Sequence, residues 1–151
     1  MSILNAFPPT ATRVQINTGD RVNERIRRRT GINLARYADK SPAEISARIR
    51  QLDREWDIER TLEANAALMI FSGLALGLLV DKKWLALSGI ASGFLIQHAL
   101  QGWCPPVSLF RSLGVRTYTE ISKEKTALKQ MRGDFTPTAG PAAALARARL
   151  S

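Results

Sequence analysis

The chain has 151 residues, 22 Lys and Arg against 13 Asp and Glu, and a net charge of +9. One cysteine and one histidine exclude a disulfide framework and a zinc site built from several such ligands, so we expect no metal or cofactor. Apolar residues are concentrated in residues 64–80 and 85–103, which contain no Asp, Glu, Lys or Arg. Soluble helices carry amphipathic stripes instead, so this distribution predicts an all-α membrane protein.

Residues 1–19 contain the turn sequences FPPTAT and NTG and predict a disordered N-terminal tail. They lack the apolar core of a signal peptide, so we expect the first apolar stretch to enter a membrane without cleavage. Residues 20–37 predict a short basic helix interrupted at Gly31. The arginines of residues 21–29 suit anionic lipid headgroups or plain exposure to solvent, and the lack of interleaved aromatic residues argues against nucleic acid.

A second helix is expected to begin after Ser41, because Ser41 and Glu44 match a capping box and a proline follows Ser41. Apolar residues then recur at helical spacing, and no proline or glycine intervenes before Gly73. We expect one long helix over residues 42–80, whose first half belongs to a basic, amphipathic cytoplasmic region, 20–63. The apolar stripe of this half needs a partner, either the same stripe in a second copy or a C-terminal helix.

The two apolar stretches would reach about 25–29 Å as helices, close to the hydrocarbon thickness of about 30 Å. They predict a two-helix transmembrane hairpin (64–80 and 85–103), and the alternative is a buried hairpin in a soluble helical protein. Twelve Lys and Arg precede residue 64, two lie in the turn and eight follow residue 103, so both termini are expected in the cytoplasm. Trp84 and Trp103 are placed to anchor the second helix at the two interfaces.

Each apolar stretch contains a GxxxG motif, formed by Gly73 and Gly77 in the first and by Gly89 and Gly93 in the second. Glycine permits close approach of two backbones, and close packing drives helix association in lipid. The motifs therefore predict packing of the two helices on each other. If one stripe is left over, they also predict a homodimer.

Gln97 and Gln101 continue the second glycine stripe, with His98 on its shoulder, and this polar strip should face protein or a water-filled notch. Cys104 follows three residues later. A catalytic pair of Cys104 and His98 is disfavoured, because the two lie on different sides of the helix and no acidic residue is apparent to orient the imidazole. A structural thiol at the interface is favoured, and a partly exposed thiol that carries sulfur or senses redox state is the alternative.

The two prolines after Cys104 are expected to end the second apolar helix and to begin a short link. Thr117 and Glu120 match another capping box and predict an amphipathic cytoplasmic helix over residues 118–133, with a glycine at its end. Residues 134–151 predict a flexible tail.

The segment QGWCPPVSLFRSLGVRT contains a Cys-Pro pair followed by Leu-Gly-Val-x-Thr. It resembles the small two-helix inner-membrane domain of the YgaP type, a family without an assigned function that in some bacterial proteins anchors and dimerises a rhodanese domain. The resemblance covers residues 64–117, with extra residues between the two parts of the motif. It implies a bacterial inner-membrane location and self-association, but no sulfurtransferase activity, because no rhodanese domain is present. The matching residues are Cys104, Pro105, Leu113, Gly114 and Thr117.

These features predict a membrane protein that serves anchoring and assembly, through homo-oligomers or by docking a cytoplasmic protein, and no enzymatic activity. One alternative is a thiol-dependent sulfur-relay or redox accessory protein that uses Cys104. Another is a small transport element whose oligomer lines a path with Gln97, His98 and Gln101.

Overall fold

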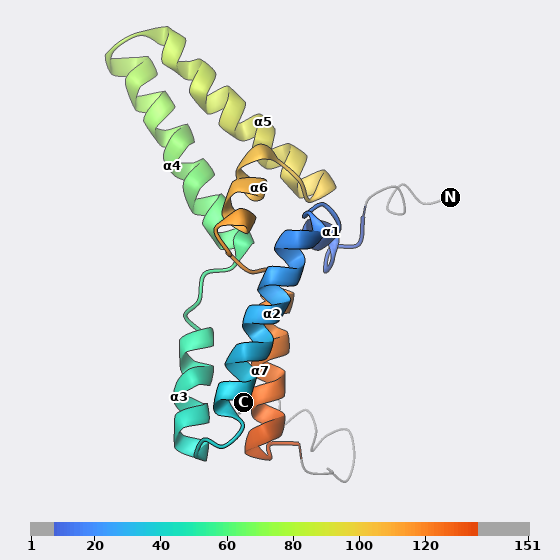
Figure 1. The fold of residues 1–151 in the computed structure, drawn as a ribbon. Coiled ribbons are helices and arrows are strands. Elements are labelled where there is room, and N and C mark those ends of the chain that lie inside the picture. Colours follow the sequence, from blue (N-terminus) through green and yellow to red (C-terminus); the bar gives the residue numbers. More distant parts are fainter. Residues whose placement is uncertain (1–7, 136–151) are drawn as a thin grey trace, which may run out of the picture.

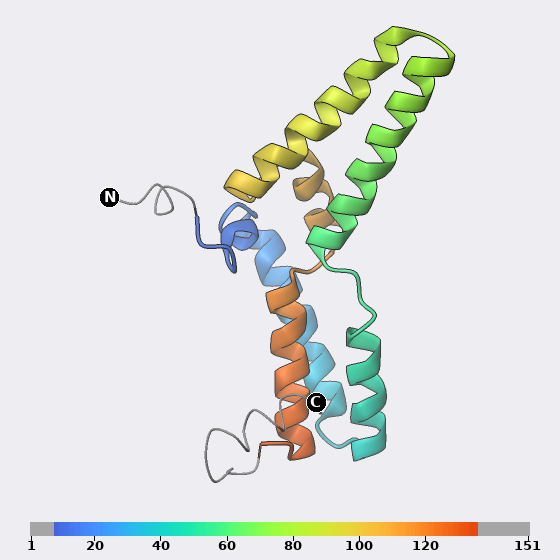
Figure 2. The ribbon, with the colours of Figure 1, turned by 180° about the vertical axis from the view of Figure 1, so that it is seen from behind.

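The computed structural model describes residues 8–135, which form helices and contain no strand. The α-helices are α1 (Arg13–Ile16), α2 (Asp20–Tyr37), α3 (Pro42–Leu52), α4 (Ile58–Leu79), α5 (Leu85–Gln101), α6 (Pro105–Ser112) and α7 (Tyr118–Arg132). Helices α4 and α5 form a long hairpin that projects from a bundle of α2, α3 and α7 (Figure 1). The short helices α1 and α6 lie where the hairpin meets the bundle, as the view from behind also shows (Figure 2).

The hairpin helices approach each other closely near the turn. A Cβ atom added at Gly73 would lie 2.6 Å from Ser88 Oγ, and one added at Gly77 would lie 2.5 Å from Leu85 Cδ2. Ser88 Oγ also donates a hydrogen bond to the backbone oxygen of Ile70, at 2.8 Å. The first GxxxG motif therefore packs α4 against α5 within one chain.

Gly89 and Gly93 lie on a different face of the hairpin. Both are exposed, and a Cβ atom at either position would meet nothing within 4 Å. Of the two interpretations of the glycine motifs, intramolecular packing thus applies to the first motif only. The second motif has no partner within residues 8–135.

Helix α4 is the one described helix that is long and apolar enough, by length and composition, to cross a membrane. Helix α5 has 17 residues against 22 in α4. The helical fold class expected from the sequence is therefore confirmed, while one candidate membrane span is found within residues 8–135 in place of two.

The bundle buries the apolar stripe of α3 against α7. Its core consists of Ile45, Ile49, Leu52, Ile121 and Leu128, against which Leu34 and Tyr37 of α2 pack. The capping boxes expected at Ser41 and Thr117 are both formed. The partner of the α3 stripe is therefore the C-terminal helix of the same chain, one of the two alternatives left open by the sequence.

The long helix expected over residues 42–80 is wrong, because α3 ends at Leu52 and α4 begins at Ile58. Asp57 caps α4 by accepting a hydrogen bond from the backbone N–H of Arg60, at 2.8 Å. The N–H of Ile58 donates to the backbone oxygen of Arg116, also at 2.8 Å. A side-chain cap and a tertiary contact thus start a new helix where the sequence contains no proline or glycine.

Three further expectations need correction. Helix α2 runs through Gly31 without a break, because this glycine is exposed and nothing crowds it. Part of the tail expected to be disordered forms α1, since Val14 is buried in a core with Ile58, Leu62, Cys104 and Val107. Helix α5 already ends at Gln101, and the two prolines occupy the first turn of α6, which replaces the expected link. Residues 1–7 and 136–151 of the expected tails lie outside the described residues.

We expect Gly73→Val to destabilise the hairpin, because the added atoms would meet Ser88 and its backbone N–H, at 2.6 and 2.8 Å from the first added carbon. Overpacking of this kind costs about 1–3 kcal/mol. The matched control, Gly31→Val in α2, adds the same atoms to an open helical position outside the hairpin and should be tolerated. Thermal unfolding of both proteins in the same detergent would compare them, and equal melting temperatures would contradict the close packing at Gly73.

Candidate functional site at the base of the hairpin

The base of the hairpin contains a buried histidine paired with a carboxylate. Glu59 lies in the first turn of α4 and His98 in the last turn of α5, and Oε2 of Glu59 is 2.7 Å from Nε2 of His98. His98 is only 3% exposed. An ionised carboxylate only accepts hydrogen bonds, so beside an ionised Glu59 the proton of this contact lies on Nε2. The sequence-based statement that no acid orients His98 is therefore wrong.

Arg13 of α1 completes this cluster. Its Nη2 donates to Glu59 Oε1 at 3.0 Å, and its Nη1 donates to the backbone oxygen of Ala99 at 2.8 Å. Asn17 Nδ2 donates to the backbone oxygen of Gln101 at 2.9 Å. The last carbonyl groups of a helix have no partner within the helix, and a cation is favourable at this end. Helix α1 and the residue after it therefore cap the C-terminus of α5.

Gly102 makes this cap possible. Its φ of +72° ends α5 in the left-handed conformation, which strongly favours glycine. A Cβ atom at Gly102 would also lie 2.5 Å from Cγ of Arg13. The chain turns at this point and the Arg13 side chain fills the space that a larger residue would occupy.

Cys104 lies beside this cluster, 1% exposed, at the N-cap position of α6. Burial raises the pKa of the Cys104 thiol, and the negative charge of Glu59 raises it further. A reactive cysteine needs an accessible site that stabilises the thiolate. The burial contradicts the alternative of a partly exposed thiol, and the arrangement disfavours Cys104 as a nucleophile.

The polar strip expected on α5 is not formed as one surface. His98 points into the hairpin base, Gln97 is half-buried and the Gln101 side chain is exposed. The two tryptophans lie near opposite ends of α5, each partly exposed, and Trp103 Nε1 donates to Ser108 Oγ at 3.2 Å. A single path lined by Gln97, His98 and Gln101 therefore does not exist within one chain.

The residues of the Cys-Pro and Leu-Gly-Val-x-Thr motif act as helix boundaries. Pro105 starts α6, and Gly114, with a φ of +90°, ends it through a hydrogen bond from the N–H of Val115 to the oxygen of Phe110. Thr117 caps α7, while Leu113 is exposed. Because these boundary residues lie within 13 positions of each other, α6 is a short helix between the end of α5 and the start of α7.

Buried arginines connect this motif to the bundle. Arg111 makes two hydrogen bonds to Glu120, at 2.7 and 2.9 Å. Arg116 pairs with Glu55 at 2.6 Å and also with Glu124.

Glu124 accepts from a second arginine, Arg48, at 2.8 Å, and is 0% exposed. Burial alone would raise the pKa of Glu124, but the hydrogen bonds from Arg116 and Arg48 outweigh it and lower the pKa below its ordinary value of 4.5. The charge pattern of α7 alone could not indicate this network, because its partners lie 8 to 76 residues away.

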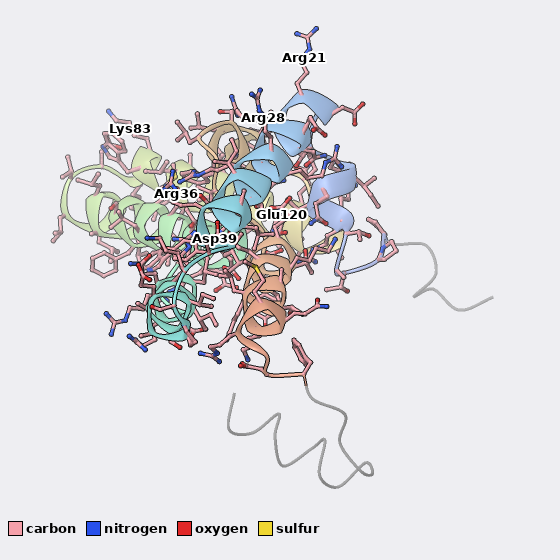
Figure 3. All side chains as sticks on the ribbon, turned by 60° about the horizontal axis from the view of Figure 1, so that its bottom comes forward. Arg21, Arg28, Arg36, Asp39, Lys83 and Glu120 are labelled. Atoms are coloured by element: carbon pink, nitrogen blue, oxygen red, sulfur yellow. The ribbon has the colours of Figure 1, made fainter. Side chains whose placement is uncertain are left out.

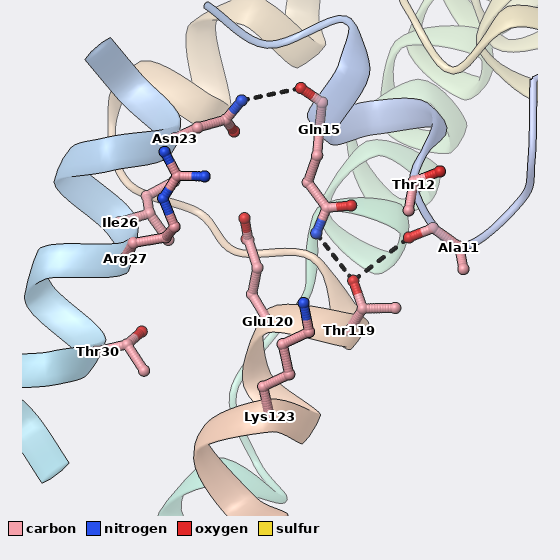
Figure 4. Close-up of a pocket in the computed structure, with 10 residues that line it drawn as sticks. All are labelled: Ala11, Thr12, Gln15, Asn23, Ile26, Arg27, Thr30, Thr119, Glu120 and Lys123. Atoms are coloured by element: carbon pink, nitrogen blue, oxygen red, sulfur yellow. Dashed lines mark hydrogen bonds between the residues drawn. The ribbon is translucent and has the colours of Figure 1, made fainter. Parts of the chain in front are cut away.

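A cavity of about 510 Å³ lies between α1, α2 and the start of α7 (Figure 4). Gln15 reaches across it and donates to Thr117 and Thr119, both at 3.0 Å. The charged groups in its lining are largely engaged elsewhere, since Arg27 pairs with Glu24 and Glu120 with Arg111. Its lining residues include neither histidine nor cysteine. They are Ala11, Thr12, Gln15, Asn23, Ile26, Arg27, Thr30, Thr119, Glu120 and Lys123.

Within residues 8–135, no group of three or more His, Cys, Asp or Glu side chains is placed to hold a metal ion. Comparisons with protein-family models, curated proteins and solved structures gave no match to this chain. The resemblance to the YgaP type therefore stays a prediction, and the arguments for function rest on the structure and the sequence.

Glu124→Gln should destabilise the bundle, because it removes the buried carboxylate that Arg116 and Arg48 share, and Arg116 keeps only Glu55 as a carboxylate partner. Breaking a buried pair in this way costs about 3–5 kcal/mol. The control, Glu24→Gln, removes an exposed ion pair with Arg27 and should change the melting temperature little.

The same network predicts how stability depends on pH. Because the pKa of Glu124 is lowered on folding, its contribution is complete above the unfolded value of 4.5 and is lost as the pH falls below it. Melting temperatures between pH 7 and 3 should therefore decline below about pH 4.5. A decline of the same size in Glu124→Gln would contradict this role for Glu124.

Proposed function

We propose that the protein is an integral anchor of the bacterial inner membrane that assembles with copies of itself or with a cytoplasmic protein. The observation that carries this proposal is the unpartnered apolar surface of the hairpin. Leu78 and Leu79 are 75% and 84% exposed, and Leu68 and Phe71 are also exposed. A large exposed apolar surface marks an interaction site, and a bilayer can cover all sides of such a helix.

The proposal includes a second crossing by α5. This helix packs antiparallel along α4, so a bilayer that surrounds α4 also surrounds α5. Its 17 residues rise about 26 Å, and none of them is Asp, Glu, Lys or Arg. Lys82 and Lys83 would then lie on the far side of the membrane, and the bundle in the cytoplasm.

Anionic lipid headgroups are the proposed partners of the first turns of α2. Helix α2 runs away from the hairpin (Figures 1 and 2), so its arginines differ in their distance from the membrane. Arg25 donates to the backbone oxygen of Ser112 at 2.6 Å, which places it beside α6 at the hairpin base. Arg21 projects outward from the same end of α2, whereas Arg36 lies near the other end (Figure 3). Each cation near the surface would contribute about 1 kcal/mol.

Self-association is proposed through the open face of α5. The lack of any group near Gly89 and Gly93 leaves room for a second backbone, and the resemblance to the YgaP type supports the same assembly. No observation favours a thiol-dependent or transport function over this one, given that Cys104 and His98 are buried while Gln101 is exposed.

The topology can be tested with reporter fusions at residues 40, 83 and 135. Because basic residues flank the hairpin on both sides, fusions at residues 40 and 135 should report the cytoplasm and the fusion at 83 the opposite side. Two results would contradict the double crossing. One is recovery of the protein in the soluble fraction, and the other is a fusion at residue 135 that reports the side of the membrane opposite the cytoplasm. A second reporter that is active on both sides of the membrane, fused at the same positions, controls for the expression level.

Self-association can be tested with a cysteine at Gln97 in a Cys104→Ala chain. Gln97 lies one turn from Gly93 on α5, so oxidation in native membranes should give a disulfide-linked dimer. Gly93→Leu should reduce this crosslink several-fold without lowering the protein level, because nothing within the chain contacts Gly93. Leu79→Ala, at the hairpin tip, is the control and should crosslink normally. Undiminished crosslinking of Gly93→Leu would exclude this face, and docking of another protein would remain.

A further inference from the structure

The hairpin helices are close together at the turn and separate toward the base. Glycines allow the contact near the turn, while Cys104 and Pro106 enter the space between α4 and α5 at the other end. A crevice of about 90 Å³ remains there. Its walls are almost entirely apolar and include Leu62, Met69 and Phe94.

Polar side chains also contribute to the lining of the crevice. His98 and Cys104 both line it. With Nε2 held by Glu59, the other ring nitrogen of His98, Nδ1, is buried and has no hydrogen-bond partner within the described part of the chain. A neutral ring that carries its proton on Nε2 presents Nδ1 as an acceptor. A buried polar atom without a partner costs about 1–3 kcal/mol, which a donor group at this position would recover.

We propose that this crevice binds a hydroxylated hydrocarbon, with the chain between α4 and α5 and the hydroxyl group donating to His98 Nδ1. Besides His98 and Cys104, the only polar residue of the lining is Asn65, and these three side chains are too few to replace the water of hydration of a charged ligand. A volume of about 90 Å³ is smaller than the apolar cavity of about 150 Å³ that holds a benzene molecule, so the crevice takes the hydroxyl end and the first carbons of a chain, and the remaining carbons lie outside it. The hydroxyl group distinguishes this ligand from the hydrocarbon chains of the surrounding lipid.

The binding site does not depend on self-association or on the direction of membrane insertion. It is formed by one chain, and its polar end is oriented by Glu59 and Arg13 through the contacts already described. It can therefore be tested on the purified full-length protein in detergent. Failure of the topology or crosslinking experiments would leave this test unaffected.

The probe is a photoactivatable octanol that carries a diazirine on its chain. Irradiation followed by mass spectrometry of peptides should place adducts on crevice residues such as Leu62 and Phe94. A tenfold excess of 1-octanol should reduce these adducts at least fivefold, whereas 1-methoxyoctane, which has no hydroxyl donor, should reduce them less than twofold. Adducts at the exposed Leu78 and Leu79 report unspecific contact and should resist both competitors.

Two variants separate the parts of the proposal. Ala91→Leu fills the crevice without touching the polar cluster, since Ala91 is a buried lining residue, and should abolish the competed adducts. His98→Phe keeps a ring of similar size but removes both nitrogens, and should make 1-octanol and 1-methoxyoctane equally weak competitors. Absence of crevice adducts in the wild type, or their persistence in Ala91→Leu, would overturn the site. Equal competition by the two compounds in the wild type would overturn the role of the hydroxyl group.

Discussion

The guanidinium group of Arg116 joins the parts of this molecule. It pairs with Glu55 after α3 and with Glu124 of α7, and it donates to Thr30 of α2 at 3.3 Å. The backbone oxygen of the same residue accepts from the first N–H of α4. One residue therefore holds the three bundle helices together and also sets the point from which the hairpin leaves. Because a buried cation is costly unless every partner is present, the bundle and the hairpin base must form in register with each other.

The local signals in the sequence were sufficient for several helix boundaries. Ser41, Glu44, Thr117 and Glu120 act within one turn, so their capping geometry follows from sequence spacing alone. The two prolines after Cys104 are an ambiguous local signal, because they suit either the end of α5 or the start of α6. Proline stops a helix that precedes it and also suits the first turn of a helix that follows, and a neighbouring glycine had already ended α5.

The candidate site could be predicted only in part. The sequence singled out His98 and Cys104 as rare residues at the end of an apolar stretch, and both lie at the hairpin base. Their partners were out of reach, because Glu59 lies 39 residues before His98 and Arg13 another 46 residues before Glu59. No periodicity links such distant positions. The sequence also could not show which glycine motif packs inside the hairpin, because both motifs have the same spacing. Only the arrangement of α4 and α5 shows that Gly73 and Gly77 face the neighbouring helix while Gly89 and Gly93 do not.

The cap on the C-terminus of α5 has a consequence for the order in which the molecule is completed. Arg13 is synthesised 86 residues before Ala99, and Asn17 is synthesised 84 residues before Gln101. The N-terminal segment must therefore wait, unattached to this partner, while both apolar helices are made. Its docking on α5 joins the N-terminal part of the described chain to the helix that returns at the end of the hairpin. Arg13 can meet Glu59 once α4 has begun, but the cap on α5 is complete only after Ala99 and Gln101 have been made.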